Sequence, residues 1–307
     1  MIINHSYNPS PQWAWKFKEL LHQELKKLPD DFTLSFSAGI DSSMILYSLM
    51  EIGKPPKQLL TFQIEDWETD DLIYAKKISK ELGIPLTISK VPRPRIQELN
   101  NIVYDIKERT GDFNKIQMQV NHLFWYMLKE IQTPNLVLGM YEDVIYETNA
   151  SLQINYRKVL RGEYSKSQFD KDYSDWKTNC YNNINKSGNT HNHYYIDKFI
   201  QSYGVTTHFP LKTESIWKLF QSVDYPTTHL YPYKDGYTIK KKWFVTHLLW
   251  KDQFDRFGNG KNNSNMHVKK KGNDINQLHC EVYNCKPSQL VGKYNKINNY
   301  VRDNWFN

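Results

Sequence analysis

The chain has 307 residues, enough to bury a substantial core as one large domain or two smaller ones. It carries 40 Lys and Arg against 33 Asp and Glu, a formal net charge of +7, which excludes a histone-like polycation. Its three cysteines are too few for a disulfide framework at this length. The sequence holds no apolar leader and no apolar run of about 18 residues. We therefore expect a protein of the reducing cytoplasm without a membrane span.

The first half of the sequence alternates between helix-like and strand-like segments. Strands that alternate with helices of about 10–15 residues predict an α/β fold with a doubly wound parallel sheet. Ligands of such sheets bind beyond the carboxyl ends of the strands. The loops at 37–43, 63–67 and 139–143 are therefore the expected site. The periodicity predicts helices at residues 11–27, 42–52, 69–82, 95–109 and 117–131, and strands at 32–36, 57–64, 85–91 and 135–141.

The second half has a weaker pattern. Residues 165–195 are polar and are predicted to form a long loop, a lid or an insertion, and helical periodicity returns at 213–223 and 238–254. Residues 261–307 carry eight Lys and Arg against three Asp and Glu, so this tail could attract nucleic acid or simply be solvated. The expected parts are an N-terminal helix (1–30), an α/β core that holds the expected site (31–150), a polar insertion or lid (151–210), a C-terminal helical part (211–260) and a basic tail (261–307).

One short stretch, "FTLSFSAGIDSSMIL" at residues 32–46, carries the clearest chemical information. A strand, a loop of small residues and a helix start together form an anion cradle, because loop N–H groups and the helix dipole both favour negative charge. Gly39 allows a close backbone approach, and the serine hydroxyls can donate to phosphate oxygens. Asp41 would repel a phosphate unless Mg²⁺ bridges them. The alternative is an ordinary helix N-cap. The cradle consists of Ser37, Ala38, Gly39, Ile40, Asp41, Ser42 and Ser43.

These residues resemble the SGGxDS pyrophosphate loop of the PP-loop, or N-type, ATP pyrophosphatases. Members of that group, among them asparagine synthetase, NAD synthetase and tRNA-modifying enzymes, share an α/β fold, cleave ATP to AMP and pyrophosphate, and adenylate a substrate oxygen. Ala38 stands where the first Gly is usual, and we expect the loop shape to survive. The resemblance implies ATP and Mg²⁺ as cofactors.

Two later segments resemble the asparagine synthetase branch. "LVLGMYEDVIYE" is similar to its LxGEGADE segment and aligns Gly139 with the Gly and Asp143 with a metal-binding Asp. Met140 stands where that group has a catalytic Glu, and Glu142 is the nearest acid. "WKDQF" resembles the KEQF segment and places Lys251 on the lysine that stabilises the transition state.

The resemblance also implies roles for these residues. Asp41 and Asp143 would hold the metal, Lys251 would contact the α-phosphate, and Glu142 would be the catalytic acid nearest to the missing Glu. Phe62 and Gln63 lie where the family holds the adenine. Weaker candidates for the same site are Glu65, Asp66, Asp112 and Asn114.

Asparagine synthetase begins with a glutaminase domain whose nucleophile is a Cys at position two, whereas this chain has Ile2. We therefore expect a stand-alone synthetase core that takes a small-molecule acceptor and an amine donor. Its nitrogen would come from free ammonia, another amine, or a separate glutaminase or carrier partner.

Three functions remain open from the sequence. The first is an AMP-forming ligase that activates a carboxylate or amide for attack by a nitrogen nucleophile. The second is a PP-loop enzyme that modifies a nucleobase in tRNA or DNA, because the tail interleaves cations with aromatic rings. The third is a catalytically weakened ATP-binding protein, suggested by Met140. His191, His193 and His208 are expected to be solvated and not metal ligands, since they have no acid at ligand spacing.

Overall fold

The computed structural model shows a three-layer α/β protein. It describes residues 11–111, 115–141, 150–185, 192–233, 236–240, 242–259 and 275–297. Five parallel strands form one sheet in the order β3-β2-β1-β4-β5, and the predicted doubly wound parallel sheet is thereby confirmed. The strands are β1 (Thr33–Ser35), β2 (Gln58–Ile64), β3 (Leu86–Val91), β4 (Asn135–Val137) and β5 (Thr206–His208).

Successive side chains of the strands point into different cores. Leu59 and Val137 pack into one apolar cluster, whereas Leu60 and Leu136 pack into another on the opposite face. Both faces are therefore covered, which is the usual state of a parallel sheet. The first cluster includes residues of α1 (Gln12–Lys26), α2 (Ile40–Glu51), α3 (Asp70–Leu82), α10 (Glu214–Ser222) and α12 (Lys251–Phe257).

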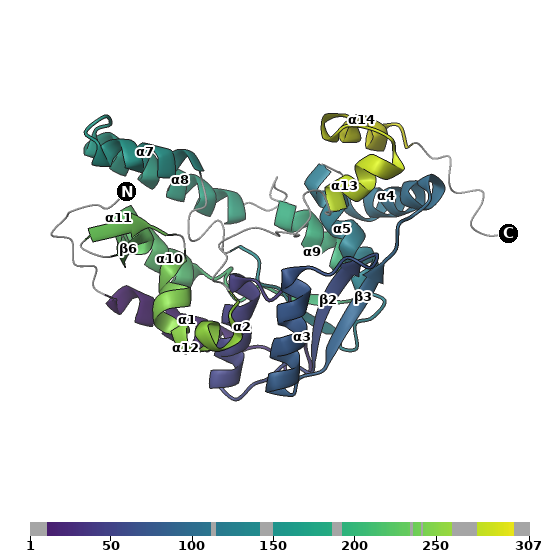
Figure 1. Cartoon of the computed structure of the whole chain (residues 1–307), viewed down its shortest axis with the longest axis horizontal. Coiled ribbons are helices and arrows are strands. Elements are labelled where there is room, and N and C mark those ends of the chain that lie inside the picture. Colours follow the sequence, from purple (N-terminus) through teal and green to yellow (C-terminus); the bar gives the residue numbers. More distant parts are fainter. Residues whose placement is uncertain are drawn as a thin grey trace.

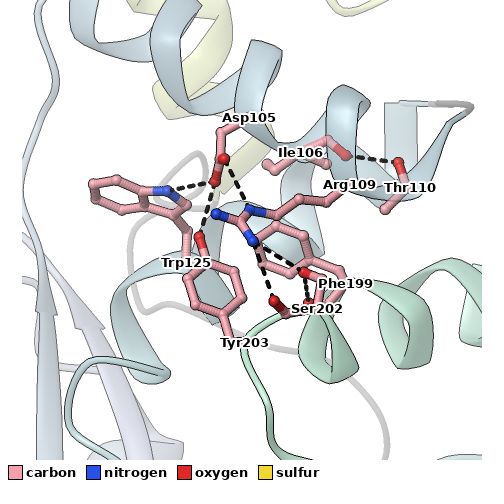
Figure 2. A network of polar contacts seen from close by, with 8 residues as sticks. All are labelled: Asp105, Ile106, Arg109, Thr110, Trp125, Phe199, Ser202 and Tyr203. Carbon is pink, nitrogen blue, oxygen red and sulfur yellow. Dashed lines mark hydrogen bonds and ion pairs between the residues drawn. The ribbon is translucent and has the colours of Figure 1, made fainter. Parts of the chain in front are cut away.

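The second face is covered by helices from the middle and from the C-terminal end of the chain, as the upper right of Figure 1 shows. Its polar centre is Asp105 (Figure 2), whose carboxylate binds the Nε of Arg109 at 2.8 Å and accepts from Trp125 and Tyr203 at 3.2 and 2.8 Å. Arg109 also donates to the carbonyl of Ser202 at 3.2 Å. This network fastens together three helices, α4 (Ile96–Thr110), α5 (Lys115–Met127) and α9 (Asn192–Gln201), and α13 (Ile275–Val282) and α14 (Leu290–Asn295) contribute to the same cluster.

The first half of the chain follows the sequence prediction closely. Helix α3 illustrates the local causes: the Thr69 side chain accepts from the backbone N–H of Leu72 at 3.1 Å, and Gly83 ends the helix in a left-handed conformation. Helix α5 ends four residues before the predicted boundary at residue 131. Strand β4 ends at Val137, four residues before the predicted boundary at residue 141.

The second half corrects several predictions. The described part of the polar segment 165–195, predicted to be a long loop, a lid or an insertion, is largely helical, so the long-loop alternative is wrong and the other two stay predictions. Its α8 (Lys166–Asn185) packs against α7 (Ala150–Leu160) around Tyr156 and Phe169. The predicted helix at 238–254 is confirmed only in part. The segment begins with the end of a hairpin strand, and its second half is helical, as a π-helical turn followed by the start of α12. The remaining elements are α11 (Tyr225–His229), β6 (Leu230–Tyr233), β7 (Gly236–Ile239), the π-turn η1 (Val245–Leu249) and the 3₁₀ turn η2 (Pro287–Gln289).

Part of the tail also folds onto the body of the protein. Two buried histidines join α5 to α13: His122 Nδ1 lies 2.7 Å from His279 Nε2, and His279 Nδ1 lies 2.6 Å from the hydroxyl of Tyr294 in α14. Burial lowers the pKa of His122 to about 3, so this contact is made by neutral rings. Among the described residues, no helix combines the length and apolarity needed to cross a bilayer.

Candidate functional site

The strand order reverses between β1 and β4, at the centre of the sheet. The chain leaves β1 toward β2 and β3 on one side, whereas β4 is followed by β5 on the other. Diverging connections at such a point leave a crevice beyond the carboxyl ends of the two strands. The predicted cradle at 37–43 follows β1, and Gly139 follows β4. The structure therefore brings these two predicted segments to the same crevice.

The loop after β1 has the compact form that the small residues predicted. Ala38 has φ +57°, a left-handed conformation that costs an L-residue about 1–2 kcal/mol. Gly39 is extended and α2 begins at Ile40. The backbone N–H groups in the first turn of α2 have no acceptor within the helix, so they point out of its N-terminal end. Ser37 Oγ accepts from the N–H of Gly39 at 3.2 Å and lies 3.2 Å from Ser42 Oγ. The loop thus gathers N–H groups and hydroxyls at a helix N-terminus.

Gly139 is needed because the chain after β4 passes directly over the start of α2. A Cβ added to Gly139 would lie 3.2 Å from the backbone nitrogen of Ser42 and 3.4 Å from the carbonyl carbon of Asp41. Both neighbours are backbone atoms, so no side-chain rotation could relieve the contact. This close backbone approach is the physical reason why a glycine at position 139 suits the predicted loop site.

A lysine that the sequence analysis did not select pairs with Asp41. Lys242 Nζ lies 2.8 Å from Oδ1 and 2.7 Å from Oδ2 of Asp41. Both side chains are largely buried, with 11% of Lys242 and 21% of Asp41 exposed. Lys242 has φ +54° and precedes η1. The run Lys240–Lys242 was the available sequence signal, but three consecutive lysines gave no means of choosing one.

Lys251, the lysine selected by resemblance, lies on the surface of α12. Its side chain is 58% exposed, and its ammonium pairs with Asp255 at 2.9 Å, one helical turn further on. The hydrogen bond to that carboxylate raises the pKa of Lys251. The structure brings Lys242, not Lys251, into contact with the Asp41 carboxylate.

The carboxyl end of β2 contributes the predicted adenine region. Gln63 pairs in register with Lys90 of β3, and Gln63 Oε1 accepts from the Lys90 ammonium at 2.5 Å. Phe62 is half-buried against the second face of the sheet. The next turn holds Glu65, which binds Arg93 at 3.0 Å, and Arg93 also contacts Glu281 of α13 at 2.7 Å. The folded part of the tail therefore reaches this edge of the sheet.

A titratable carboxyl lies close by, in the first turn of α3. Burial, together with the neighbouring Asp70, raises the pKa of Asp71 to about 6. This group changes charge near neutral pH at the end of the loop that follows β2.

Other predicted residues fall outside the described part of the chain, namely Glu142, Asp143, Asp112, Asn114 and His191. Within the part that the structure describes, no group of three His, Cys, Asp or Glu side chains could hold a metal ion. His208 lies in β5, 3.0 Å from Asn135 Oδ1.

The comparison with protein families agrees with this geometry. Residues 29–138 match the asparagine synthase family. The match covers 110 of the 307 residues, from the approach to β1 to the end of β4, and it includes the whole cradle. The predicted resemblance to PP-loop ATP pyrophosphatases of the asparagine synthetase type is confirmed over this segment, and the match supports the use of ATP. Gly139, Met140 and Lys251 lie beyond it.

Two solved structures are similar to the chain. NMN synthetase from Francisella tularensis is 11% identical with a TM-score of 0.28, covering 70% of this chain and 92% of its own. The U34-tRNA thiolase NcsA from Methanococcus maripaludis, with its 4Fe-4S cluster, is 14% identical with a TM-score of 0.31, covering 94% of this chain and 80% of its own. At these TM-scores the fold assignment rests on the strand order of the chain itself. No curated protein matches the chain.

Proposed function

We propose that this protein is an ATP-dependent adenylating ligase that cleaves ATP between the α and β phosphates. The observation that carries the proposal is the Asp41–Lys242 pair, set in a small-residue cradle where the strand order of the sheet reverses. The family match supports the ATP substrate. The reaction would transfer AMP to a carboxylate or amide oxygen, release pyrophosphate and prepare the acyl carbon for a nitrogen nucleophile.

The cradle supplies three kinds of group that bind polyphosphate. The N–H groups of the first turn of α2 point outward with the positive end of the helix dipole, and Ser37 and Ser42 add hydroxyls. Lys242 supplies a mobile cation, which can move from Asp41 to a phosphate oxygen as the nucleotide enters. The released Asp41 carboxylate then fits Mg²⁺, which when bound would neutralise charge on the phosphates.

Lys242 would do its main work as pyrophosphate leaves. Attack on the α-phosphorus shifts negative charge onto the bridging oxygen and the departing phosphates, and a preorganised lysine stabilises that charge without reorganising solvent. Lys251 remains the prediction of the family resemblance for this role. The contact between Lys242 and Asp41 supports Lys242 for this role instead.

The acceptor and the amine would approach from the strand-end edge of the sheet, where Gln63 and Phe62 are proposed to border the adenine. The nitrogen would come from a free amine or from a separate glutaminase or carrier partner. Glu142 and Asp143 remain the proposed catalytic acid and second metal ligand.

Nucleobase modification is the second candidate, and the folded tail favours it. Lys286 and Lys296 are exposed on the C-terminal segment, and Arg93 connects that segment to the strand-end edge. Cations on a segment that is joined to the strand-end edge could help to hold a polynucleotide acceptor. A catalytically weakened ATP-binding protein would keep the cradle and lose turnover.

The test is pyrophosphate release from Mg-ATP in the presence of separate pools of small metabolites and of tRNA. The ligase predicts stimulation by the small-molecule pool, and nucleobase modification predicts salt-sensitive stimulation by tRNA. ATP binding without pyrophosphate release in either pool would contradict the ligase and favour the weakened protein.

A further inference from the structure

The buried side of the cradle is hydrogen-bonded to one side chain that lies more than 200 residues later in the sequence. Asn259 follows α12 and is 1% exposed. Its Nδ2 donates to the carbonyl of Ala38 at 3.1 Å and to Ser43 Oγ at 2.8 Å, and its Oδ1 accepts from the hydroxyl of Tyr47 at 3.0 Å. Ala38, Ser43 and Tyr47 are each no more than 2% exposed. One buried amide thus joins three points of the loop and of α2.

The local sequence explains how Asn259 reaches this place. Phe254 and Phe257, on one side of α12, pack against the ring of Tyr47 with centroids 5.2 and 5.8 Å away. Gly258 then ends the helix with φ +78°, a conformation that favours glycine. The turn directs Asn259 inward, beneath Ala38. The segment that the sequence analysis selected for Lys251 therefore contacts the cradle through its last turn and Asn259.

The orientation of the Asn259 amide is fixed by its partners. The carbonyl of Ala38 can only accept, so Nδ2 must face it, and Oδ1 must then face Tyr47. Burial raises the pKa of the Tyr47 hydroxyl, which therefore stays protonated and donates. All of the amide's polar groups have partners, so rotating it would leave buried groups unpaired.

The bond to Ala38 has a direct consequence for the top of the loop. The carbonyl of Ala38 and the N–H of Gly39 belong to one planar trans peptide, and they point in opposite directions. Holding the carbonyl down toward Asn259 turns the Gly39 N–H toward Ser37 Oγ, which accepts it at 3.2 Å. Ser37 Oγ in turn lies beside Ser42 Oγ. The amide beneath the loop therefore sets the hydroxyls above it.

We infer that Asn259 is a positioning residue that holds the Ala38–Gly39 peptide in its phosphate-binding orientation. It compensates for the strained left-handed backbone at Ala38, where a glycine would need no such support. The inference rests on the proposed function for its ligand, and it adds that the C-terminal helical part shapes a loop 221 residues away in sequence.

The test is a double-mutant cycle between positions 259 and 38. Asn259→Ala should weaken the binding of Mg-ATP at least tenfold, measured by titration calorimetry at a temperature where the variant is folded. Ala38→Gly alone should change the affinity less than twofold. In the Asn259→Ala background, Ala38→Gly should restore at least threefold of the lost affinity, because glycine adopts φ +57° without support. Asn295→Ala, an exposed asparagine of α14, is the matched control and should bind as the wild type does.

Two outcomes would overturn the inference. The first is an Asn259→Ala protein that binds Mg-ATP with wild-type affinity. The second is an effect of Ala38→Gly on affinity that is the same with and without Asn259, which a merely structural role predicts. If Asn259→Ala does not fold, Tyr47→Phe removes the hydroxyl that donates to Asn259 Oδ1 and keeps the ring in place. It should weaken ATP binding about threefold, and unchanged affinity would contradict the inference.

The same cycle separates this inference from the proposed function. If the wild type binds no ATP, the proposed function fails, and the melting temperature without nucleotide becomes the readout. If Asn259 supports the strained backbone at Ala38, then Ala38→Gly should raise the melting temperature more in the Asn259→Ala protein than in the wild type. Equal increments would overturn the inference.

Discussion

Gly139→Ala tests whether the chain after β4 and the cradle form one site. The added methyl would meet the Ser42 nitrogen at 3.2 Å and two further backbone atoms at 3.4 Å, so the backbone must move by a few tenths of an ångström. Overpacking of this kind costs about 1–3 kcal/mol. Because the atoms that must move belong to the first turn of α2, we expect much of this cost to appear in nucleotide binding. Since 1.4 kcal/mol is a factor of ten, affinity for Mg-ATP should fall about tenfold to hundredfold.

The assay is titration calorimetry of Mg-ATP, with the melting temperature of the free protein as a check on folding. Gly292→Ala is the matched control, because Gly292 lies in α14 with no atom within 4 Å of an added Cβ. Alanine there should bind ATP normally and stabilise the fold by about 0.4–1 kcal/mol. A folded Gly139→Ala protein that binds ATP within twofold of the wild type would refute the argument that Gly139 permits the close approach on which the cradle depends.

Three further predictions follow from the contacts described. Asp41→Asn keeps the shape of the side chain and removes its charge, so pyrophosphate release should fall at least a hundredfold, and release at the wild-type rate would exclude a role for this carboxylate. Lys242→Met should lower the rate of pyrophosphate release at least a hundredfold, whereas Lys251→Met should change it less than threefold; the reverse ranking, measured at saturating ATP, would assign the role to Lys251. His122 has a folded pKa of about 3 against 6.5 in an unfolded chain, so the unfolded state binds more protons between these values. The contribution of His122 to the free energy of unfolding is fully present above pH 6.5 and is lost as the pH falls, by up to about 1.4 kcal/mol per pH unit. The raised pKa of Asp71 makes the folded state more stable as the pH falls below 6, which is the opposite of the effect of His122. Asp71 is present in both the wild type and the His122 variant, so its effect cancels when the two are compared. His122→Asn should therefore lower the free energy of unfolding at pH 7 and flatten its dependence between pH 6.5 and 4.5, as measured by urea denaturation, and an unchanged slope would show that the histidine is not buried as a neutral ring.

The sequence was most informative where a local pattern decides structure. Alternation of buried strands with amphipathic helices correctly located the first four strands, and capping residues such as Thr69 and Gly83 set the ends of α3. Strand β5 (TTH) has no apolar residue to mark it as a buried strand, and the β6–β7 hairpin contains a proline and a glycine, which are depleted in strands. Residues 238–254 were predicted only in part, because their apolar spacing suits one continuous helix, whereas the chain there ends a strand and then forms a π-turn and the start of α12.

The site residues also fall into those that the sequence could predict and those that it could not. The loop at 37–43 and Gly139 could be found because each has a local signature, and parallel strand ends must meet at one edge of the sheet. Lys242 and Asn259 could not be found, because their roles depend on tertiary packing that brings residues more than 200 positions apart into contact. Lys251 was selected from a short resemblance that contains no information on which face of α12 is buried.

The measurement that tests the central claim most directly is the identity of the products of ATP. Purified protein would be incubated with Mg-ATP labelled at the α-phosphate, together with the pool that stimulates it, and AMP and ADP would be separated and counted. We expect labelled AMP without labelled ADP, and this AMP should be lost in Lys242→Met. ADP with inorganic phosphate would contradict the central claim, because the cradle would then serve cleavage at the γ-phosphate and not between the α and β phosphates.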